Sequence, residues 1–239
     1  MFYEFIQDKL INKSITKYLH IRHGDIICVA GAGGKTSTIK ILTKQLVQKK
    51  YKVLVTTTTK MFKEDRVITI KNKNLVKQSI QENSWVFTGK DLGNKIASWD
   101  KDYLSEIIKL ADISLIEADG AKCLPFKLPK IGEPVYLNEA NKIIYLIGMK
   151  ALYQPLENLC RVELLEDFLQ KPRREKLTKD DIIKVILSES GAKKSVEKRD
   201  LYIILNQVDD FNLLQEAIAI AQVVTKKGLK IAISSYLDK

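Results

Sequence analysis

Two kinds of apolar pattern alternate along the chain. Short apolar runs typical of buried strands occupy residues 26–30, 52–57, 67–70, 85–88, 111–117, 141–148, 201–205 and 230–235. Between them, apolar residues recur at helical spacing over residues 39–46, 73–81, 104–110 and 213–224. Strands that alternate with helices favour a mostly parallel sheet that helices cover on both faces. The pattern therefore predicts an α/β fold.

Two segments depart from this alternation. Residues 3–20 have the spacing of one or two amphipathic helical turns, which lead into a turn signal at residues 24–25. Residues 151–200 contain two amphipathic helices, predicted over 162–169 and 179–187, with a basic stretch between them. We therefore predict one α/β domain over residues 1–239, with a small helical insertion at about residues 151–200.

The clearest chemistry lies where the first buried strand meets the first long helix. Residues 31–36 read Gly-Ala-Gly-Gly-Lys-Thr. Glycines let backbone N–H groups turn toward an anion, and a helix N-terminus adds its positive end. Lys35 can reach the terminal phosphates of a nucleotide, and the Thr36 hydroxyl can bind Mg²⁺. The residues predicted to hold the nucleotide here are Gly31, Ala32, Gly33, Gly34, Lys35, Thr36 and Ser37.

This loop is a shorter form of the usual phosphate-binding loop. The usual pattern has a further glycine where this chain has Val29. A preceding strand and a following helix are nevertheless the context that such a loop requires. The sequence thus predicts a P-loop NTPase-like three-layer sandwich with a mostly parallel sheet.

A run of hydroxyl residues follows the strand at residues 52–57. Ligands bind at the carboxyl ends of strands in open α/β sheets, so Thr58, Thr59 and Lys60 could contact the γ-phosphate or its metal. Threonine is also a good strand residue, and β-structure alone would explain the run. Both interpretations stay open.

Glu117 and Asp119 end the strand at residues 111–117. Residues i and i+2 of a strand point to one face, so both carboxylates can face one ligand. We expect one of them to hold Mg²⁺, together with Thr36, and the other to orient a nucleophile. Lys35, Lys60 and Asp119 are the predicted catalytic residues.

A late strand ends in Asn206-Gln-Val-Asp209, which is similar to the base-reading Asn-Lys-x-Asp of GTPases. In that motif the Asp accepts hydrogen bonds from guanine N–H groups that adenine lacks. Gln207 replaces the lysine whose stem packs on the base. The predicted nucleotide is therefore GTP or ATP, with guanine favoured over adenine.

Composition limits the partners and the compartment. The chain carries 40 Lys plus Arg against 29 Asp plus Glu, a formal net charge of +11. The lysines are scattered, and no stretch interleaves basic clusters with aromatic residues, so a nucleic-acid partner is not expected. The three cysteines are far apart and form no CxxC pair, which suits a reducing cytoplasm. With no signal peptide or membrane-length apolar run, we expect a cytoplasmic protein without a membrane partner.

Taken together and in order, several motifs resemble one family. They are Val-Ala-Gly-Ala-Gly-Gly-Lys-Thr-Ser at residues 29–37, Val-Thr-Thr-Thr-Thr-Lys-Met at 55–61, Glu-Ala-Asp-Gly-Ala-Lys at 117–122, Leu-Pro-Phe-Lys-Leu-Pro at 124–129 with Glu133-Pro134, Ile-Gly-Met at 147–149 and Leu-Asn-Gln-Val-Asp at 205–209. This combination resembles the selenium-dependent hydroxylase accessory proteins, the YqeC family. The resemblance implies a step in maturing the selenium-containing molybdenum cofactor of bacterial hydroxylases.

The resemblance also extends the predicted site and its partners. It adds Lys122, Lys127 and Glu133 to the residues that bind the nucleotide, with Arg161 as a further candidate. It implies a molybdopterin-type cofactor, a molybdenum hydroxylase or a selenium-donor protein as a partner beside the nucleotide. Whether the thiol of Cys123 has a chemical role stays open.

Two functions remain open from the sequence. The first is a Mg²⁺-dependent nucleotide hydrolase or nucleotidyl or phosphoryl transferase that serves cofactor maturation. The second is a non-enzymatic switch or chaperone that changes shape with its nucleotide and binds a hydroxylase or a selenium donor.

Overall fold

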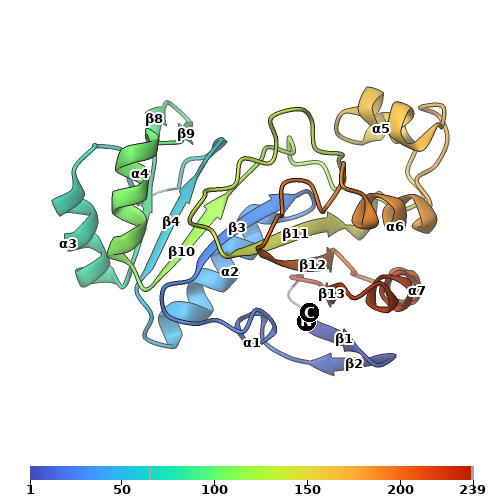
Figure 1. The fold of residues 1–239 in the computed structure, drawn as a ribbon, viewed down its shortest axis with the longest axis horizontal. Coiled ribbons are helices and arrows are strands. Elements are labelled where there is room, and N and C mark those ends of the chain that lie inside the picture. Colours follow the sequence, from blue (N-terminus) through green and yellow to red (C-terminus); the bar gives the residue numbers. More distant parts are fainter. Residues whose placement is uncertain (65, 238–239) are drawn as a thin grey trace.

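One large sheet organises the computed structural model, which describes residues 1–64 and 66–237. Its strands are β1 (Phe2–Ile6), β2 (Lys9–Asn12), β3 (Ile26–Gly31), β4 (Val53–Thr57), β6 (Val67–Ile68), β7 (Trp85–Thr88), β10 (Ile113–Glu117), β11 (Lys142–Gly148), β12 (Asp200–Asn206) and β13 (Lys230–Ser234). Their order is β2-β1-β13-β12-β11-β3-β10-β4-β7-β6 (Figure 1). Neighbours from β13 to β6 are parallel, whereas β1 pairs antiparallel with both of its neighbours. The predicted α/β fold with a mostly parallel sheet is confirmed.

Helices pack on both faces of this sheet. They are α1 (Ile15–Tyr18), α2 (Lys35–Gln48), α3 (Lys73–Asn83), α4 (Lys101–Ile107), α5 (Val162–Leu169), α6 (Lys179–Leu187) and α7 (Phe211–Lys226). Successive strand residues point to opposite faces, so Ile27 and Val29 pack with α1 and α2. Cys28 and Ala30 face the core shared with α5, α6 and α7. Helices α3 and α4 cover the same face as this second group, over β4 and β7.

The connections diverge at β3, near the middle of the sheet. The chain leaves β3 through α2 and reaches β4 on one side, while the segment after β10 crosses to β11 on the other side. In open α/β sheets, such a switch in direction leaves a crevice at the carboxyl ends of the strands. The fold therefore places residues 31–34, the glycine loop, at the crevice.

The prediction of helical turns over residues 3–20 is wrong for most of that segment. Residues 2–12 form the β1–β2 hairpin, and only α1 is helical. The two turn residues, Gln7 and Asp8, have φ values of 48° and 59°. Positive φ at both positions matches the twist of a tight hairpin but is usually carried by Asn-Gly. Glu4 is buried against Lys13, which masks the strand alternation.

The helices predicted at 162–169 and 179–187 lie where expected, as α5 and α6. They stand between β11 and β12, together with short 3₁₀ turns at Met149–Ala151 and Leu156–Asn158. Thr178 and Asp181 form a capping box at the start of α6, which fixes its first turn. Apolar residues of α5 and α6 belong to the same buried cluster as Ile203 and Leu205 of β12.

A second, three-stranded sheet was not predicted. It consists of β5 (Lys60–Phe62), β9 (Lys95–Ala97) and β8 (Lys90–Leu92), in that order and antiparallel. The Gly93-Asn94 turn between β8 and β9 is a recognised hairpin signal. This sheet follows directly from the end of β4 and so lies beside the crevice. None of the helices described is long and apolar enough to cross a membrane.

Candidate functional site

The glycine loop is packed tightly against the end of β11. A Cβ atom at Gly31 would lie 2.1 Å from the Leu146 carbonyl oxygen, and one at Gly33 would lie 2.3 Å from the Gly148 backbone. Both glycines have positive φ, 89° and 85°. The Ala32 N–H donates to the Leu146 carbonyl at 2.9 Å. Close approach and left-handed backbone together require glycine at these positions.

The N-terminus of α2 opens into a cavity of about 490 Å³. The helix begins at Lys35, and its N-cap residue, Gly34, has no side chain that could cap it. The first N–H groups of a helix have no acceptor within the helix, and they form its positive end. Because residues 33–37 all line the cavity, these groups are available to an anion bound there.

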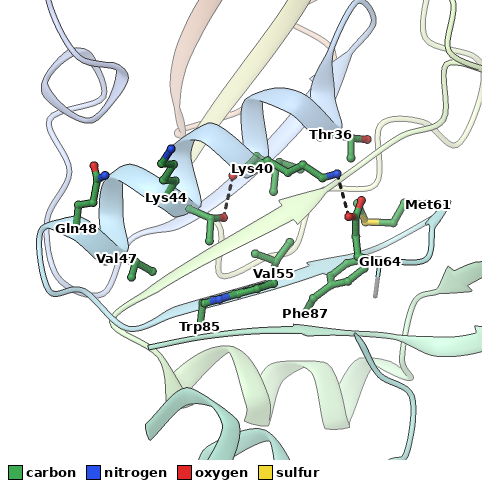
Figure 2. Close-up of a pocket in the computed structure, with 12 residues that line it drawn as sticks. Thr36, Lys40, Lys44, Val47, Gln48, Val55, Met61, Glu64, Trp85 and Phe87 are labelled. Carbon is green, nitrogen blue, oxygen red and sulfur yellow. Dashed lines mark hydrogen bonds and ion pairs between the residues drawn. The ribbon is translucent and has the colours of Figure 1, made fainter. Parts of the chain in front are cut away.

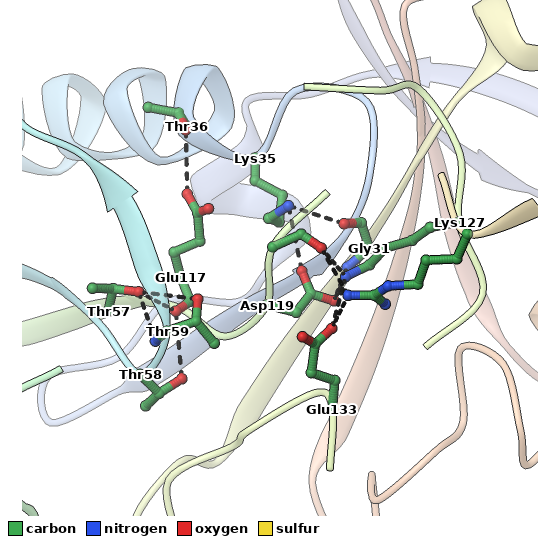
Figure 3. Close-up of polar contacts among 12 residues, drawn as sticks. Gly31, Lys35, Thr36, Thr57, Thr58, Thr59, Glu117, Asp119, Lys127 and Glu133 are labelled. Atoms are coloured by element: carbon green, nitrogen blue, oxygen red, sulfur yellow. Dashed lines mark hydrogen bonds and ion pairs between the residues drawn. The ribbon is translucent and has the colours of Figure 1, made fainter. Parts of the chain in front are cut away.

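Beneath the loop lies a buried cluster of charges (Figure 3). Asp119 Oδ2 accepts from the Gly31 N–H at 2.9 Å and from Lys127 Nζ at 2.6 Å. Lys35 Nζ lies 3.3 Å from Asp119 Oδ1 and donates to the Gly31 carbonyl at 3.0 Å. The side chains of Asp119 and Lys127 are fully buried, and neither lines the cavity. Their contacts support a role in holding the loop rather than in touching a ligand.

Glu117 has different surroundings, although it stands only two residues away. It lines the cavity, and its Oε2 accepts a hydrogen bond from Thr36 Oγ1 at 3.2 Å. Burial raises the pKa of Glu117, and the Asp119 carboxylate adds to this against the opposing charge of Lys35. A hydroxyl and a single carboxylate, side by side at the start of α2, are oxygen donors of the kind that Mg²⁺ prefers. The described residues contain no cluster of three or more His, Cys, Asp or Glu side chains that would suit another metal site.

The threonines after β4 hold the strand ends together. Thr57 Oγ1 donates to the Glu117 carbonyl at 2.9 Å, and Thr58 Oγ1 donates to the Val135 carbonyl at 2.7 Å. The Thr59 N–H donates to Thr57 Oγ1 at 3.0 Å. Thr58 and Thr59 do not line the cavity. Their geometry therefore fits the interpretation that the threonine run is there for β-structure rather than for contact with a phosphate. Lys60, by contrast, is exposed and lines it.

The segment after β10 is held from both sides. Lys127 Nζ donates to the Gly120 carbonyl at 2.8 Å. Arg161, at the start of α5, donates to the carbonyls of Gly120 and Leu128 and pairs with Glu133. Partial burial alone would raise the pKa of Glu133, but Arg161 and Lys127 outweigh it and lower that pKa. The structure thus brings together the residues that the resemblance added, with Arg161 and Lys122 at the cavity and Lys127 and Glu133 behind it.

Four lining residues have left-handed backbone without being glycine. They are Lys122 (φ 49°), Cys123 (61°), Arg161 (64°) and Gln207 (62°). Such conformations cost on the order of 1–3 kcal/mol each and gather at functional sites. In addition, Gln207 Oε1 is buried and accepts no hydrogen bond from any residue that the structure describes. Both features make this wall a candidate for ligand binding.

Sequence reasoning missed part of the cavity. Met61, Phe62 and Lys95 line it from the small sheet, and Cys160 lines it from the segment before α5. Lys95 Nζ stands 4.8 Å from the centre of the Phe62 ring. The Gly93-Asn94 hairpin signal could have placed Lys95. Cys123 is exposed at the cavity and Cys160 is buried, and all three cysteines are free thiols.

The two predicted base-reading residues, Asn206 and Asp209, lie in different surroundings. Asn206 is buried, donates to the Gly33 carbonyl at 2.8 Å and accepts from Ser234 Oγ at 2.8 Å. Asp209 accepts from Ser235 Oγ at 2.6 Å and pairs with Lys150 at 2.8 Å. Partial burial opposes these contacts, which nevertheless lower the pKa of Asp209. Asp209 lines a separate hollow of about 450 Å³, so it does not meet the glycine loop directly.

Comparison with known proteins places this geometry in a family. The profile of the YqeC protein family matches residues 27–163, more than half of the chain. The match runs from β3 to the start of α5, and therefore includes the glycine loop, Glu117, Asp119 and Arg161. The chain is also similar to a protein of Escherichia coli (strain K12) described as uncharacterized protein YqeC. The two are 26% identical over 181 residues, which cover 72% of this chain and 71% of the relative. On the family match, this chain belongs to the YqeC protein family.

Proposed function

We propose that this protein is a P-loop nucleotide-binding protein that uses Mg²⁺. The observation that carries the proposal is the uncapped N-terminus of α2, which opens into the cavity beside the Thr36–Glu117 pair. A helix N-terminus with a lysine and free N–H groups suits the phosphates of a nucleotide. The tight glycine positions at 31 and 33 support the same interpretation, because a side chain there would displace the loop.

The residues present fit the metal as well. Mg²⁺ is commonly held by one or two carboxylates together with phosphate oxygens and water. Thr36 and Glu117 would supply the protein ligands, and the bound metal would neutralise charge on the phosphates. Asp119, which the sequence suggested as a second ligand, lies outside the cavity. Its Oδ2 is engaged by Gly31 and Lys127, and its buried Oδ1 faces Lys35 without a hydrogen bond. We therefore propose Glu117 as the metal carboxylate.

Lys35 would exchange its protein partners for phosphate oxygens when a nucleotide binds. Its ammonium group contacts the Gly31 carbonyl and Asp119. In the proposed complex it would neutralise the terminal phosphates, with Lys60 and Lys122 facing the same cavity from the other side. These cations, with the α2 N-terminus, would stabilise charge that develops during phosphoryl or nucleotidyl transfer or hydrolysis.

The base would lie on the β12 side. Asn206 touches the glycine loop from β12, and the orphaned Gln207 Oε1 and the Asp209 carboxylate follow it. A carboxylate can accept from the ring N1–H and the 2-amino group of guanine together, a pair that adenine lacks, so GTP is proposed over ATP.

Replacement of the loop lysine tests the proposal. Lys35→Ala should weaken Mg²⁺-GTP and Mg²⁺-ATP binding by about 10- to 150-fold in calorimetry, since charge-assisted hydrogen bonds contribute about 1.5–3 kcal/mol. Thr36→Ala should reduce the dependence on Mg²⁺. The control is Lys49→Ala at the exposed C-terminal end of α2, which should bind as the wild type does. Equal affinities for Lys35→Ala and Lys49→Ala would exclude the proposed site.

One observation favours a nucleotide-dependent switch as the second candidate. Asp119, predicted to orient a nucleophile, is fully buried and paired. Glu117 is then the only carboxylate among the described residues that line the cavity, and it is the proposed metal ligand. A site without a free general base suits slow turnover. Hydrolysis measured with the isolated protein separates the two functions, because rapid release of phosphate would exclude the switch.

The pathway is proposed from the family resemblance. Nucleotide binding or turnover would serve maturation of the selenium-containing molybdenum cofactor, with a molybdopterin-type cofactor, a molybdenum hydroxylase or a selenium donor as the partner. Deletion of the gene in its host should then lower molybdenum hydroxylase activity without lowering the amount of hydroxylase protein. Unchanged hydroxylase activity would separate this protein from that pathway.

A further inference from the structure

A second concave site runs along α2. This α2 groove has a volume of about 510 Å³ and lies between α2 and the strands β4 and β7 (Figure 2). Ile39, Thr43 and Val47 form its helix wall, and Val55, Trp85 and Phe87 form its floor. Ligand sites in proteins typically have volumes of about 300–1,000 Å³ and mostly apolar walls.

The groove exists because no described helix covers this face of β7. Helix α2 packs over β3, β10 and β4, whereas α3 and α4 pack against Leu54 and Val86 on the opposite face. Phe87 and Val55, which are only 1% and 5% exposed, point to the α2 side. The floor is therefore apolar and aromatic, and Trp85 is half-buried at its far end.

Cations line the rim of this apolar floor. Lys40 reaches from α2 to Glu64 across the groove, with their charged atoms 2.9 Å apart, as Figure 2 shows. Lys44, one turn further along α2, is exposed and forms no ion pair with any residue in the described ranges. Glu64 lines the groove as well, so Lys44 is the rim cation whose charge no carboxylate among the described residues offsets. An anionic group on the edge of a ring system would meet Lys44, whereas an uncharged ligand would gain nothing from it.

The groove meets the cavity of the glycine loop. Thr36 and Met61 line both. Across the sheet, the order runs from β12 with Asn206, through β3 with the loop and β10 with Glu117, to β4 and β7 beneath the groove. A nucleotide whose base lies toward β12 therefore has its terminal phosphate toward the groove. From Thr36 to Gln48 the groove extends for about 18 Å, at 1.5 Å per helical residue.

We propose that the α2 groove binds a second ligand of this protein, a small molecule with a planar aromatic ring system and anionic substituents. Its rings lie against Trp85 and Phe87, its anionic edge faces Lys44 and Lys40, and one end reaches Thr36. That this ligand lies beside a bound nucleotide rests on the proposed function. The apolar floor and the cationic rim do not depend on it.

The probe for this site is 8-anilinonaphthalene-1-sulfonate, an aromatic anion, titrated into the full chain by calorimetry. Lys44→Glu inverts the rim charge and should weaken binding about three- to tenfold, since exposed pairs contribute up to about 1 kcal/mol and like charges repel by similar amounts. Val47→Glu places a charge on the apolar wall and should weaken binding by about tenfold or more. Matched controls are Lys77→Glu on α3 and Val223→Glu on the exposed side of α7, which should bind as the wild type does.

The outcomes separate this proposal from the proposed function. Lys35→Ala should keep probe affinity while it loses nucleotide, and Lys44→Glu should keep nucleotide affinity while it loses probe. Suppose that the wild-type protein binds the probe but no nucleotide, and that Lys44→Glu and Val47→Glu lose probe affinity. This result would overturn the proposed function and leave the groove as a ligand site. Absence of probe binding, or equal losses in the groove variants and their controls, would overturn the groove proposal. Circular dichroism verifies that each variant is folded. If Val47→Glu does not fold, then Lys44→Glu, which changes an exposed position, decides the test.

Discussion

Glu117 and Asp119 stand two residues apart at the end of β10, yet they belong to different regions of the site. Asp119 is enclosed beneath the glycine loop, where it contacts the Gly31 N–H and two lysines. Glu117 borders the cavity with one hydrogen bond, from Thr36, and a raised pKa. One region is enclosed by protein, and the other borders a cavity with room for a ligand.

The comparison shows what a pair of carboxylates at the end of a strand can do. An enclosed carboxylate such as Asp119 fixes the backbone around it but is not accessible to a metal in the cavity. Burial disfavours the ionised form of a carboxylate such as Glu117, and a cation that binds beside it stabilises that form. The enclosed region should therefore govern stability, and the open region should govern binding.

Loss of the Asp119 carboxylate should have the largest effect. Asp119→Ala removes the closest partner of the buried Lys127, whose other carboxylate, Glu133, lies 3.6 Å away. Breaking a buried ion pair by removing one partner costs about 3–5 kcal/mol. We expect a loss of this size in the free energy of unfolding, measured by urea denaturation. The control is Asp102→Ala, an exposed aspartate on α4, which should change stability by at most about 0.5 kcal/mol. If Asp119→Ala unfolds like the wild type, then the enclosed region is not what holds the loop.

Arg161 should have the next largest effect, because it extends the enclosed region. Arg161→Ala removes hydrogen bonds to two carbonyls and leaves Glu133 without its closest partner. The expected loss in unfolding free energy is about 1–3 kcal/mol. Arg161→Lys keeps the charge but not the planar fork, and should recover only part of that loss. Full recovery by lysine would show that charge alone matters at this position.

The pH dependence of stability should distinguish Glu117. Because burial raises its pKa, the folded protein retains the Glu117 proton to higher pH than the unfolded chain does. Its contribution to stability is therefore fully present below the ordinary pKa of 4.5 and is lost as pH rises through the raised value. Glu117→Gln removes this titration, so its stability relative to the wild type should rise across that window. Denaturation midpoints measured from pH 4 to 8 test this, and a difference independent of pH would contradict the raised pKa.

The parts of the fold that depend on local sequence could be predicted. Buried strands such as β3 and β11 are continuous apolar runs, and the Thr178–Asp181 capping box marks the start of α6. The β1–β2 hairpin could not be predicted in the same way. Its turn rests on Gln7 and Asp8 in left-handed conformation, and the pairing of β1 with β13 joins the two ends of the chain.

The same distinction holds for the candidate site. The glycine loop, Lys35 and Thr36 are adjacent in sequence, so spacing alone indicates their chemistry. The role of Asp119 depends on Lys127, which returns to it after a segment without regular structure. Strand alternation predicts that Glu117 and Asp119 face one ligand, but it contains no information about which of them the later segment would cover. The position of Lys95 likewise depends on how the small sheet folds back.

The smallest effect on stability should come from Lys60, at the open region. Its side chain is exposed and forms no hydrogen bond or ion pair with any other residue that the structure describes, so Lys60→Ala should change the free energy of unfolding by at most about 0.5 kcal/mol. An exposed charge beside phosphates contributes about 0.2–1 kcal/mol, so nucleotide affinity should fall by up to about fivefold. The loss should shrink in high salt, because the charge is accessible to counterions. Lys90→Ala is the matched control, because Lys90 is an exposed lysine on β8 of the same small sheet and lies outside the cavity. A loss of stability without a loss of affinity would mean that Lys60 belongs to the enclosed region, and that Glu117 and Thr36 alone form the open one.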